Sequence, residues 1–171
     1  MKRPPTKTLG DYLLEAEPVA ALWLDLVHIV YLDSPRIAHP ERLESAAKTL
    51  FDVGCFEGEM INGGMSQFFS NSAGNRAQES LAALRRVGAS LCAELLAKGI
   101  TIFPGGVVPE DRHSRCNLLF QFEEREPQFL EDLTQVFYQR VIPSASIPAE
   151  DLITLQLEFM RQHREERVVA S

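Results

Sequence analysis

Apolar residues recur every three or four positions through most of this chain, and no segment alternates apolar and polar residues as a half-buried strand does. Between Pro18 and Asp33, for example, the apolar positions keep helical spacing until "DSPR" ends the pattern. No repeat of fixed period interrupts this organisation. The sequence therefore predicts an all-α fold, a single-domain multi-helix bundle of about seven helices.

We expect one helical domain over residues 11–171, after a basic, flexible N-terminus at residues 1–10. The most apolar run, residues 19–32, has 14 residues and is too short to cross a bilayer, and no export signal is visible. Three widely spaced cysteines, Cys55, Cys92 and Cys116, are typical of neither a disulfide framework nor a zinc site. We expect a cytoplasmic protein.

The longest predicted helix runs over residues 40–60 and ends at "NGG", where Gly63 or Gly64 should supply a positive φ. Glu57 falls near the middle of its apolar face, so we expect a buried acid with a partner there. Further helices are expected at "GMSQFF", at residues 77–87, 89–103, 109–122 and 125–141, and after "SIP". Gly88 is a candidate helix terminator.

Negative charge is concentrated in two blocks of the chain. Residues 11–59 hold ten acidic and three basic residues, and residues 123–158 hold eight acidic and two basic residues, in a chain of net charge −7. Nucleic-acid binders instead carry clustered Lys and Arg, so we expect no direct contact with nucleic acid and no membrane partner. Partners selected by charge should be basic; the alternative is that the acidic residues only keep the protein soluble.

Reaction chemistry is not evident in the sequence. The four histidines form no H-E-x-x-H pair, and "FPGGVV" lacks the Lys and the Ser or Thr of a phosphate-binding loop. Glu123, Glu124 and Glu126 stand beside Arg125 and Pro127, where solvated charge explains them better than acid–base catalysis. We expect no catalytic residues, no metal and no cofactor.

The stretch from Gly58 to Arg115 combines several short motifs in order: N-G-G, Q-F-F, N-S-x-G, A-L-x-x-V-G-A, F-P-G-G and P-x-D-R. Together they resemble the signature of a bacterial domain family of unknown function that is named for a DNA-mimic protein. Met65 departs from the pattern, which usually has an aromatic residue there. The motif positions singled out are Asn62, Gly63, Gly64, Gln67, Phe68, Phe69, Asn71, Gly74, Gly88, Pro104, Gly105 and Gly106.

Our interpretation of these motifs is structural. We expect Asn62 and the glycines to end one helix, Phe68 and Phe69 to anchor the next in the core, and Asn71 or Ser72 to cap the following turn.

The resemblance implies an all-helical fold and a non-catalytic function. The namesake of the family imitates the negative charge of duplex DNA, is understood to act as a dimer, and occupies DNA-binding proteins such as a transcription factor in competition with their operators. For this chain it implies a basic, DNA-binding protein partner, such as a transcription factor or a nucleoid protein, and a homodimer. Fold transfers between relatives more safely than activity.

Any surface that imitates DNA must combine several elements. Duplex DNA carries a charge about every 1.7 Å, whereas the polar stripe of the longest helix places three acids over roughly 27 Å. The candidate partner-binding residues are therefore drawn from both acidic blocks: Glu41, Glu44, Asp52, Glu59, Glu123, Glu124, Glu126, Glu131 and Asp132.

Two other functions remain open at this point. The protein could be an immunity or antitoxin protein that inhibits a cationic toxin. It could also be an enzyme that uses Asn62, Gln67, Asn71 and Glu57 as a polar pocket beneath "NGG", although no nucleophile accompanies them.

Overall fold

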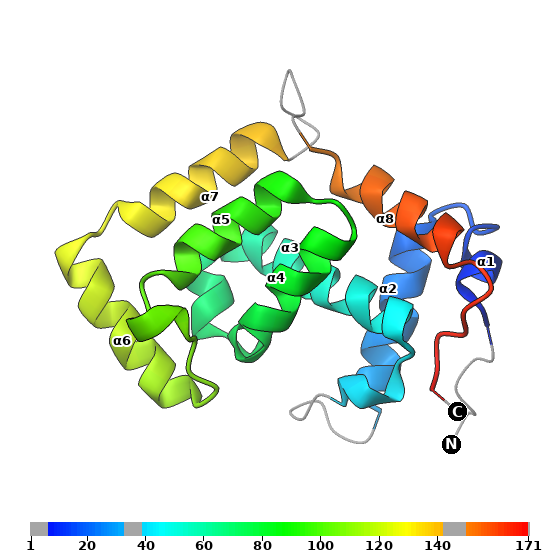
Figure 1. The fold of residues 1–171 in the computed structure, drawn as a ribbon, viewed down its shortest axis with the longest axis horizontal. Coiled ribbons are helices and arrows are strands. Elements are labelled where there is room, and N and C mark those ends of the chain that lie inside the picture. Colours follow the sequence, from blue (N-terminus) through cyan, green and yellow to red (C-terminus); the bar gives the residue numbers. More distant parts are fainter. Residues whose placement is uncertain (1–6, 33–38, 142–149, 171) are drawn as a thin grey trace. The chain divides into compact units, whose positions relative to one another are not determined.

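The regular secondary structure of this protein is helical. The computed structural model describes residues 7–32, 39–141 and 150–170, and within them only two isolated β-bridges accompany the helices. The α-helices are α1 (Leu9–Tyr12), α2 (Pro18–Val30), α3 (Ser45–Ser70), α4 (Ala77–Arg86), α5 (Ser90–Ile100), α6 (Arg112–Arg125), α7 (Phe129–Arg140) and α8 (Leu152–Gln162) (Figure 1). Short 3₁₀ helices are η1 (Pro40–Arg42), η2 (Ser72–Arg76) and η3 (Pro104–Gly106). The predicted all-α class is confirmed.

The chain divides into two compact units. The first consists of Met1–Phe51 and Ile153–Ser171, and the second of Asp52–Leu152, so α3 begins in one unit and ends in the other. Both units contain part of the segment 11–171 that we expected to form one domain. Of the expected flexible N-terminus, residues 1–6 lie outside the described residues, and Leu9 begins α1 with its side chain buried.

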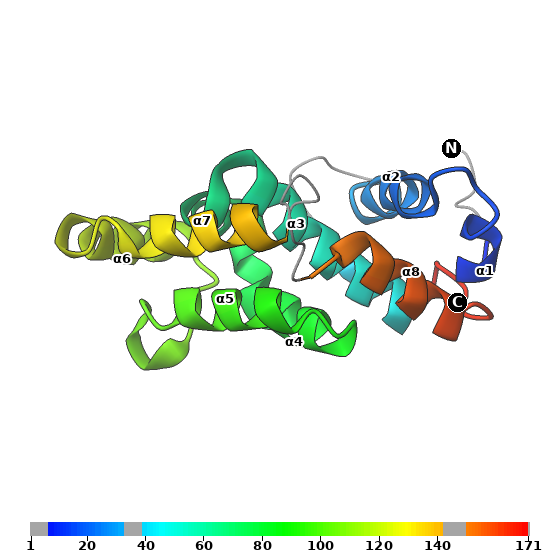
Figure 2. The same ribbon diagram turned by 90° about the horizontal axis from the view of Figure 1, so that it is seen from above.

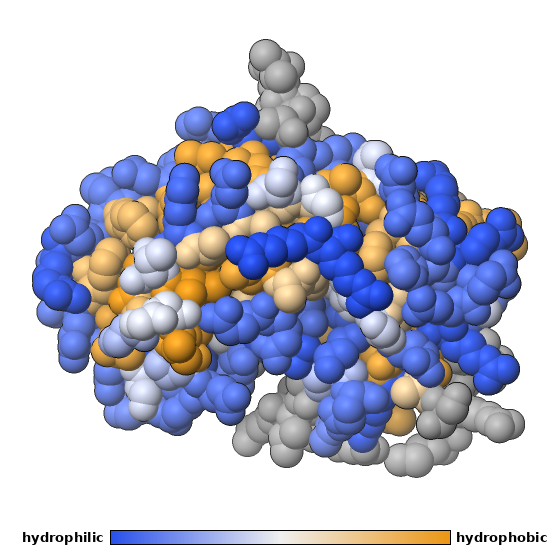
Figure 3. All heavy atoms as spheres, viewed as in Figure 1, coloured by the Kyte–Doolittle hydropathy of each residue, from blue (hydrophilic) through white to orange (hydrophobic). Residues whose placement is uncertain are grey.

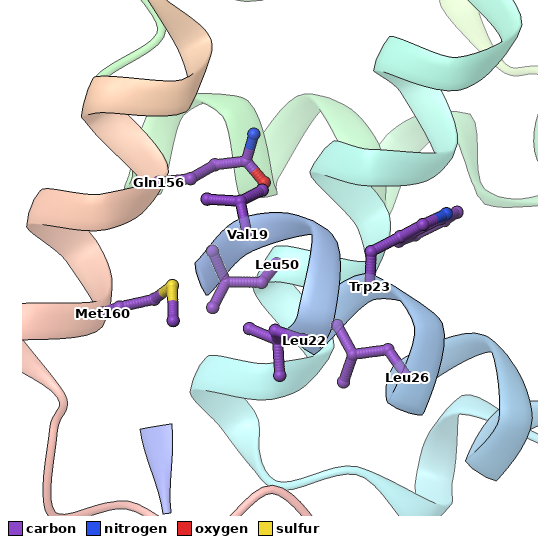
Figure 4. Close-up of a pocket in the computed structure, with 7 residues that line it drawn as sticks. All are labelled: Val19, Leu22, Trp23, Leu26, Leu50, Gln156 and Met160. Carbon is purple, nitrogen blue, oxygen red and sulfur yellow. The ribbon is translucent and has the colours of Figure 1, made fainter. Parts of the chain in front are cut away.

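In the first unit, α2, the start of α3 and α8 form an apolar core. The Trp23 ring stacks on Phe51 with 5.8 Å between centroids. Side chains of the three helices enclose a small cavity of about 10 Å³, which has room for about one water molecule. Figure 4 shows the residues that line it. The cavity is lined by Val19, Leu22, Trp23, Leu26, Leu50, Gln156 and Met160.

The carboxyl-terminal residues of the first unit are held by backbone hydrogen bonds on both sides. The Val168 amide donates to the Lys7 carbonyl (3.1 Å), and the Val168 carbonyl accepts from the Glu44 amide (3.0 Å). The Val168 side chain is fully buried. These bonds connect the two ends of the chain within this unit.

The second unit has an aromatic core. Phe68 contacts Phe56 and Phe69 edge to face, with centroid distances of 5.5 and 5.3 Å, and Phe69 contacts Phe103 at 5.0 Å. Around this core, α4 and α5 form a hairpin at Gly88, which has φ +83°, and α5 lies beside α7 (Figures 1 and 2). The predicted role of Gly88 as a helix terminator is confirmed.

Two predicted helix starts were wrong by a few residues. Pro40 begins the 3₁₀ turn η1, and α3 starts only at Ser45. Pro109 precedes α6, whose cap is Asp111: its carboxylate accepts the amide hydrogen bond of Ser114 at 2.8 Å. In both cases a proline just before the helix marks the turn that leads into it.

The amino end of α5 is capped by a distant carboxylate. Glu150, only 8% exposed, accepts hydrogen bonds from the amides of Leu91 (2.8 Å) and Cys92 (2.9 Å). These amides are among the donors that a helix leaves without intrahelical partners.

Among the described residues no helix is both long and apolar enough to cross a membrane.

Candidate partner-binding surface

The N-G-G motif breaks α3 in two. Gly64 has φ +76° and ψ −163°, and a Cβ atom there would lie 2.5 Å from the Thr134 side chain. Thr134 accepts the hydrogen bond of the Met65 amide at 3.0 Å, and the Tyr138 hydroxyl lies 2.9 Å from the Met60 carbonyl oxygen. Gly64 therefore has the positive φ that the sequence predicted, and α7 satisfies the polar backbone groups at the break.

The side-chain amides of the Q-F-F and N-S-x-G motifs both donate to one carboxylate. Glu59 accepts hydrogen bonds from Gln67 (2.8 Å) and Asn71 (2.9 Å). We expected the side chain of Asn71 or Ser72 to cap this turn. That expectation was wrong, because Asn71 binds Glu59 and η2 has no side-chain cap. Glu57 lies elsewhere, half-buried, where its charge raises the pKa of the Cys92 thiol, after the larger effects of burial and of Glu150. Of the postulated polar pocket, Gln67 and Asn71 thus meet at Glu59, whereas Glu57 acts on Cys92.

A buried arginine organises the N-S-x-G turn. The Arg115 side chain is fully buried, and burial lowers its pKa. All five of its N–H groups have an acceptor: the carbonyl oxygens of Phe69, Asn71, Pro109 and Glu110 and the side-chain oxygen of Asn75, at 2.6 to 3.1 Å.

Gly74 is required beside this arginine, because a Cβ atom there would lie 2.7 Å from the Arg115 Nε. We expected no role for Arg115 from its place in the sequence. Its one available signal was its spacing, since it precedes the fully buried Leu119 by one helical turn.

Asp52 does not lie on the predicted acidic stripe. Its side chain is buried, the residue being 3% exposed, and Arg76 binds both carboxylate oxygens at 2.7 and 2.9 Å. Ser80 on α4 also donates a hydrogen bond to the Asp52 carbonyl oxygen. The face of α3 that we expected to meet solvent is thus covered within the second unit, and we correct the assignment of Asp52 to a partner-binding surface.

The remaining acids of the first block are partly engaged. Glu59 is half-buried by its two amide partners, and Glu44 is half-buried beside the carboxyl-terminal residues of the first unit. Glu41 is exposed and lies 2.8 Å from His39 Nδ1; hydrogen bonds from its own backbone amide and from His39 lower its pKa. In the contacts of the described residues, none of these three acids has a second acidic side chain beside it.

The second block forms a denser group, which we call the acidic corner. It lies where α6 ends and α7 begins in the second unit, and consists of Glu123, Glu124, Glu126, Glu131 and Asp132. Glu123 is half-buried and the other four residues are exposed. Figure 3 shows hydrophilic side chains over this corner.

Charge at the acidic corner is little compensated. Within the described part of the chain none of its five carboxylates forms an ion pair. The neighbouring Arg125 donates to the Gln121 carbonyl instead, and Glu131 accepts from the neutral Gln135 amide at 2.6 Å. Glu131 and Asp132 also lie in the first turn of α7, where the helix dipole favours them. The corner thus presents five carboxylates within ten residues.

The described residues contain no group of three His, Cys, Asp or Glu side chains that could hold a metal ion, and all three cysteines are unpaired.

Comparison with known proteins identifies the family. The family model of the DMP19-like protein matches residues 41–163, which is well over half of the chain. No curated protein and no solved structure matches the chain. The matched region includes every motif of the N-G-G to P-x-D-R stretch as well as the acidic corner. The chain therefore belongs to the DMP19-like protein family, the DNA-mimic family that its motifs resemble.

Proposed function

We propose that this protein is a non-catalytic DNA mimic that binds the basic surface of a DNA-binding protein and thereby keeps DNA from that surface. The observation that carries the proposal is the acidic corner, whose five carboxylates have no ion-pair partner among the described residues. Membership in the DMP19-like family supports the same class of function.

The physical basis of binding is electrostatic. Exposed carboxylates that outnumber the neighbouring cations and form no ion pair raise the negative potential of the surface, which accelerates encounter with a positively charged partner and disfavours wrong partners. Such an interaction weakens as salt is added, because the Debye length falls from roughly 10 Å at 0.1 M to roughly 3 Å at 1 M ionic strength. We place the partner in the cytoplasm, where three free thiols stay reduced.

The proposal is tested by an affinity screen against the purified DNA-binding proteins of the host at several salt concentrations. We expect at least one basic protein to bind, with an affinity that falls as salt rises. The variant E124Q/E126Q/E131Q/D132N should weaken this binding at least tenfold at low salt. If the screen finds no salt-sensitive basic partner, the proposed function is wrong.

A matched control separates the corner from general acidity. Glu94 is exposed on α5 of the same unit and is outside the acidic corner. The substitution Glu94→Gln should leave the affinity within about twofold, because a lone rim charge contributes little. An equal loss from E94Q and from single substitutions in the corner would mean that only net charge matters.

A further inference from the structure

A large aromatic side chain stands exposed beside the acidic corner. Phe120, on α6, is 58% exposed, whereas the adjacent Leu119 is fully buried. In Figures 1 and 2, α6 lies at the outer end of the second unit, and among the described helices of that unit none covers its outward side. Leu24 on α2 is a second large apolar side chain that is exposed, at 71%, and its surroundings can be compared with those of Phe120.

The face of α6 that carries Phe120 is negatively charged. Residues three and four positions apart are neighbours on a helix, so Glu123 and Glu124 flank the ring one turn further on. Arg125 falls roughly 140° away around the helix axis, and its Nε bonds to the Gln121 carbonyl. Within one turn of the ring on α6, residues 116–124, there are therefore two carboxylates and no lysine or arginine.

Leu24 has a different setting. Its neighbours at three and four positions are Ala20, Ala21, Val27 and His28, none of them acidic. An isolated exposed apolar residue is ordinary on a protein surface. What distinguishes Phe120 is the combination of an exposed aromatic ring and two adjacent carboxylates.

We propose that Phe120 is the anchor at which the partner docks an arginine side chain. A guanidinium is planar and weakly hydrated, so it stacks on an aromatic face while its N–H groups donate to carboxylates beside it. Glu123 and Glu124 stand where they accept those hydrogen bonds. The occupant is thus an arginine-rich segment of a basic protein, selected by the charge of this face. This inference rests on the proposed function. It adds to the acidic corner one aromatic side chain, Phe120, that contacts the partner directly.

The anchor and the carboxylates have separable effects. Carboxylates act over distance and set the salt dependence of binding, whereas a stacked arginine acts only in contact and sets the lifetime of the complex. Loss of the ring should therefore lower affinity without changing the slope of affinity against salt concentration.

The test uses the full-length protein and two fluorescent peptides, octa-arginine and octa-lysine, with binding followed by anisotropy at several salt concentrations. Wild type should bind octa-arginine more tightly than octa-lysine. Phe120→Ala should weaken octa-arginine binding roughly threefold to thirtyfold, the range expected for one cation–π contact. The salt slope should not change, whereas Glu124→Gln should reduce it.

Three control variants keep the result specific. Phe120→Trp should retain tight binding of octa-arginine, Phe120→Leu should lose it as Phe120→Ala does, and Leu24→Ala should change nothing. Thermal unfolding of each variant should match wild type, because both residues are exposed.

The outcomes distinguish this inference from the function on which it rests. Wild-type protein that binds neither peptide contradicts both. Salt-sensitive binding that Phe120→Ala leaves unchanged, or that Phe120→Leu retains, overturns the arginine anchor alone and leaves the electrostatic proposal standing.

Discussion

The Arg76 guanidinium binds both oxygens of the buried Asp52 carboxylate, at 2.7 and 2.9 Å, and thereby connects η2 to α3. The same arginine also approaches Glu79, an exposed residue one turn along α4, at 3.7 Å. One cation thus has a buried and an exposed acidic partner. The two contacts differ in solvent exposure and should differ in energy.

Asp52→Asn should destabilise the protein by about 3 kcal/mol, because it leaves a largely buried guanidinium without its counter-charge. Glu79→Gln should cost less than about 1 kcal/mol, since exposed ion pairs contribute little. Urea unfolding of the two variants measures the difference. Equal stabilities would show that the pair with Asp52 is not structural.

Gly64→Ala should destabilise the protein by about 3 kcal/mol, because φ +76° with ψ −163° is a backbone conformation that essentially only glycine adopts and because the new Cβ would collide with Thr134. Gly105 is the control: it has φ +67° and ψ +10°, a left-handed conformation that costs a non-glycine residue less, and a Cβ there would meet nothing within 4 Å. Gly105→Ala should cost about 1 kcal/mol, the backbone strain alone. Thermal unfolding of both variants checks the prediction, which fails if the two losses agree.

Arg115→Lys should cost about 3 kcal/mol or more despite keeping the positive charge. A lysine has three donors on one nitrogen, so at least two of the five acceptors around Arg115 would lose their hydrogen bond in a buried site. Arg112→Lys is the control, because Arg112 is exposed and makes one bond, to the Ser70 carbonyl. Similar unfolding midpoints for the two variants would contradict this role of Arg115.

Burial raises the pKa of the Cys55 thiol from its ordinary value of 9.0 to about 12, with a smaller contribution from the charge of Asp52. At pH 8 alkylation of Cys55 by iodoacetamide should therefore be at least tenfold slower in the native than in the urea-unfolded protein, because the thiolate is the nucleophile. Peptide mass spectrometry measures both rates.

The same pKa shift has a consequence for stability. The unfolded thiol ionises near pH 9 and the folded one only near pH 12, so its contribution to stability is complete below pH 9 and is lost as pH rises toward 12. Cys55→Ala should lessen the loss of stability between pH 8 and pH 11. An unchanged pH profile would show that this thiol is accessible in the folded protein.

Helical spacing was sufficient to predict the fold class, the break at Gly64 and the terminator at Gly88, because each follows from local chemistry. It was insufficient for Asp52. A helical-wheel projection of one helix assumes a single buried face and a solvent-exposed face opposite. Helix α3 is instead buried on several sides, because Phe51, Asp52 and Phe56 are all covered. Which faces of a central helix are covered depends on distant segments.

The same limit explains two other residues. Glu150 stands just before α8 in the sequence, where it suggests charge at that helix's amino end, yet its carboxylate caps α5 about sixty residues earlier. Arg115 sits among polar residues, and only the assembled turn supplies its carbonyl acceptors. By contrast, the acidic corner lies within ten consecutive residues, so the sequence could indicate its composition.

The central claim, that this protein takes the place of DNA on a basic partner, is tested most directly by competition. A DNA-binding protein identified in the screen is bound to its fluorescent duplex, and this protein is titrated in while anisotropy reports release of the DNA. We predict that wild-type protein displaces the duplex and that E124Q/E126Q/E131Q/D132N needs at least tenfold more protein to do so. Simultaneous binding of DNA and this protein, or equal displacement by the neutralised variant, would contradict the account.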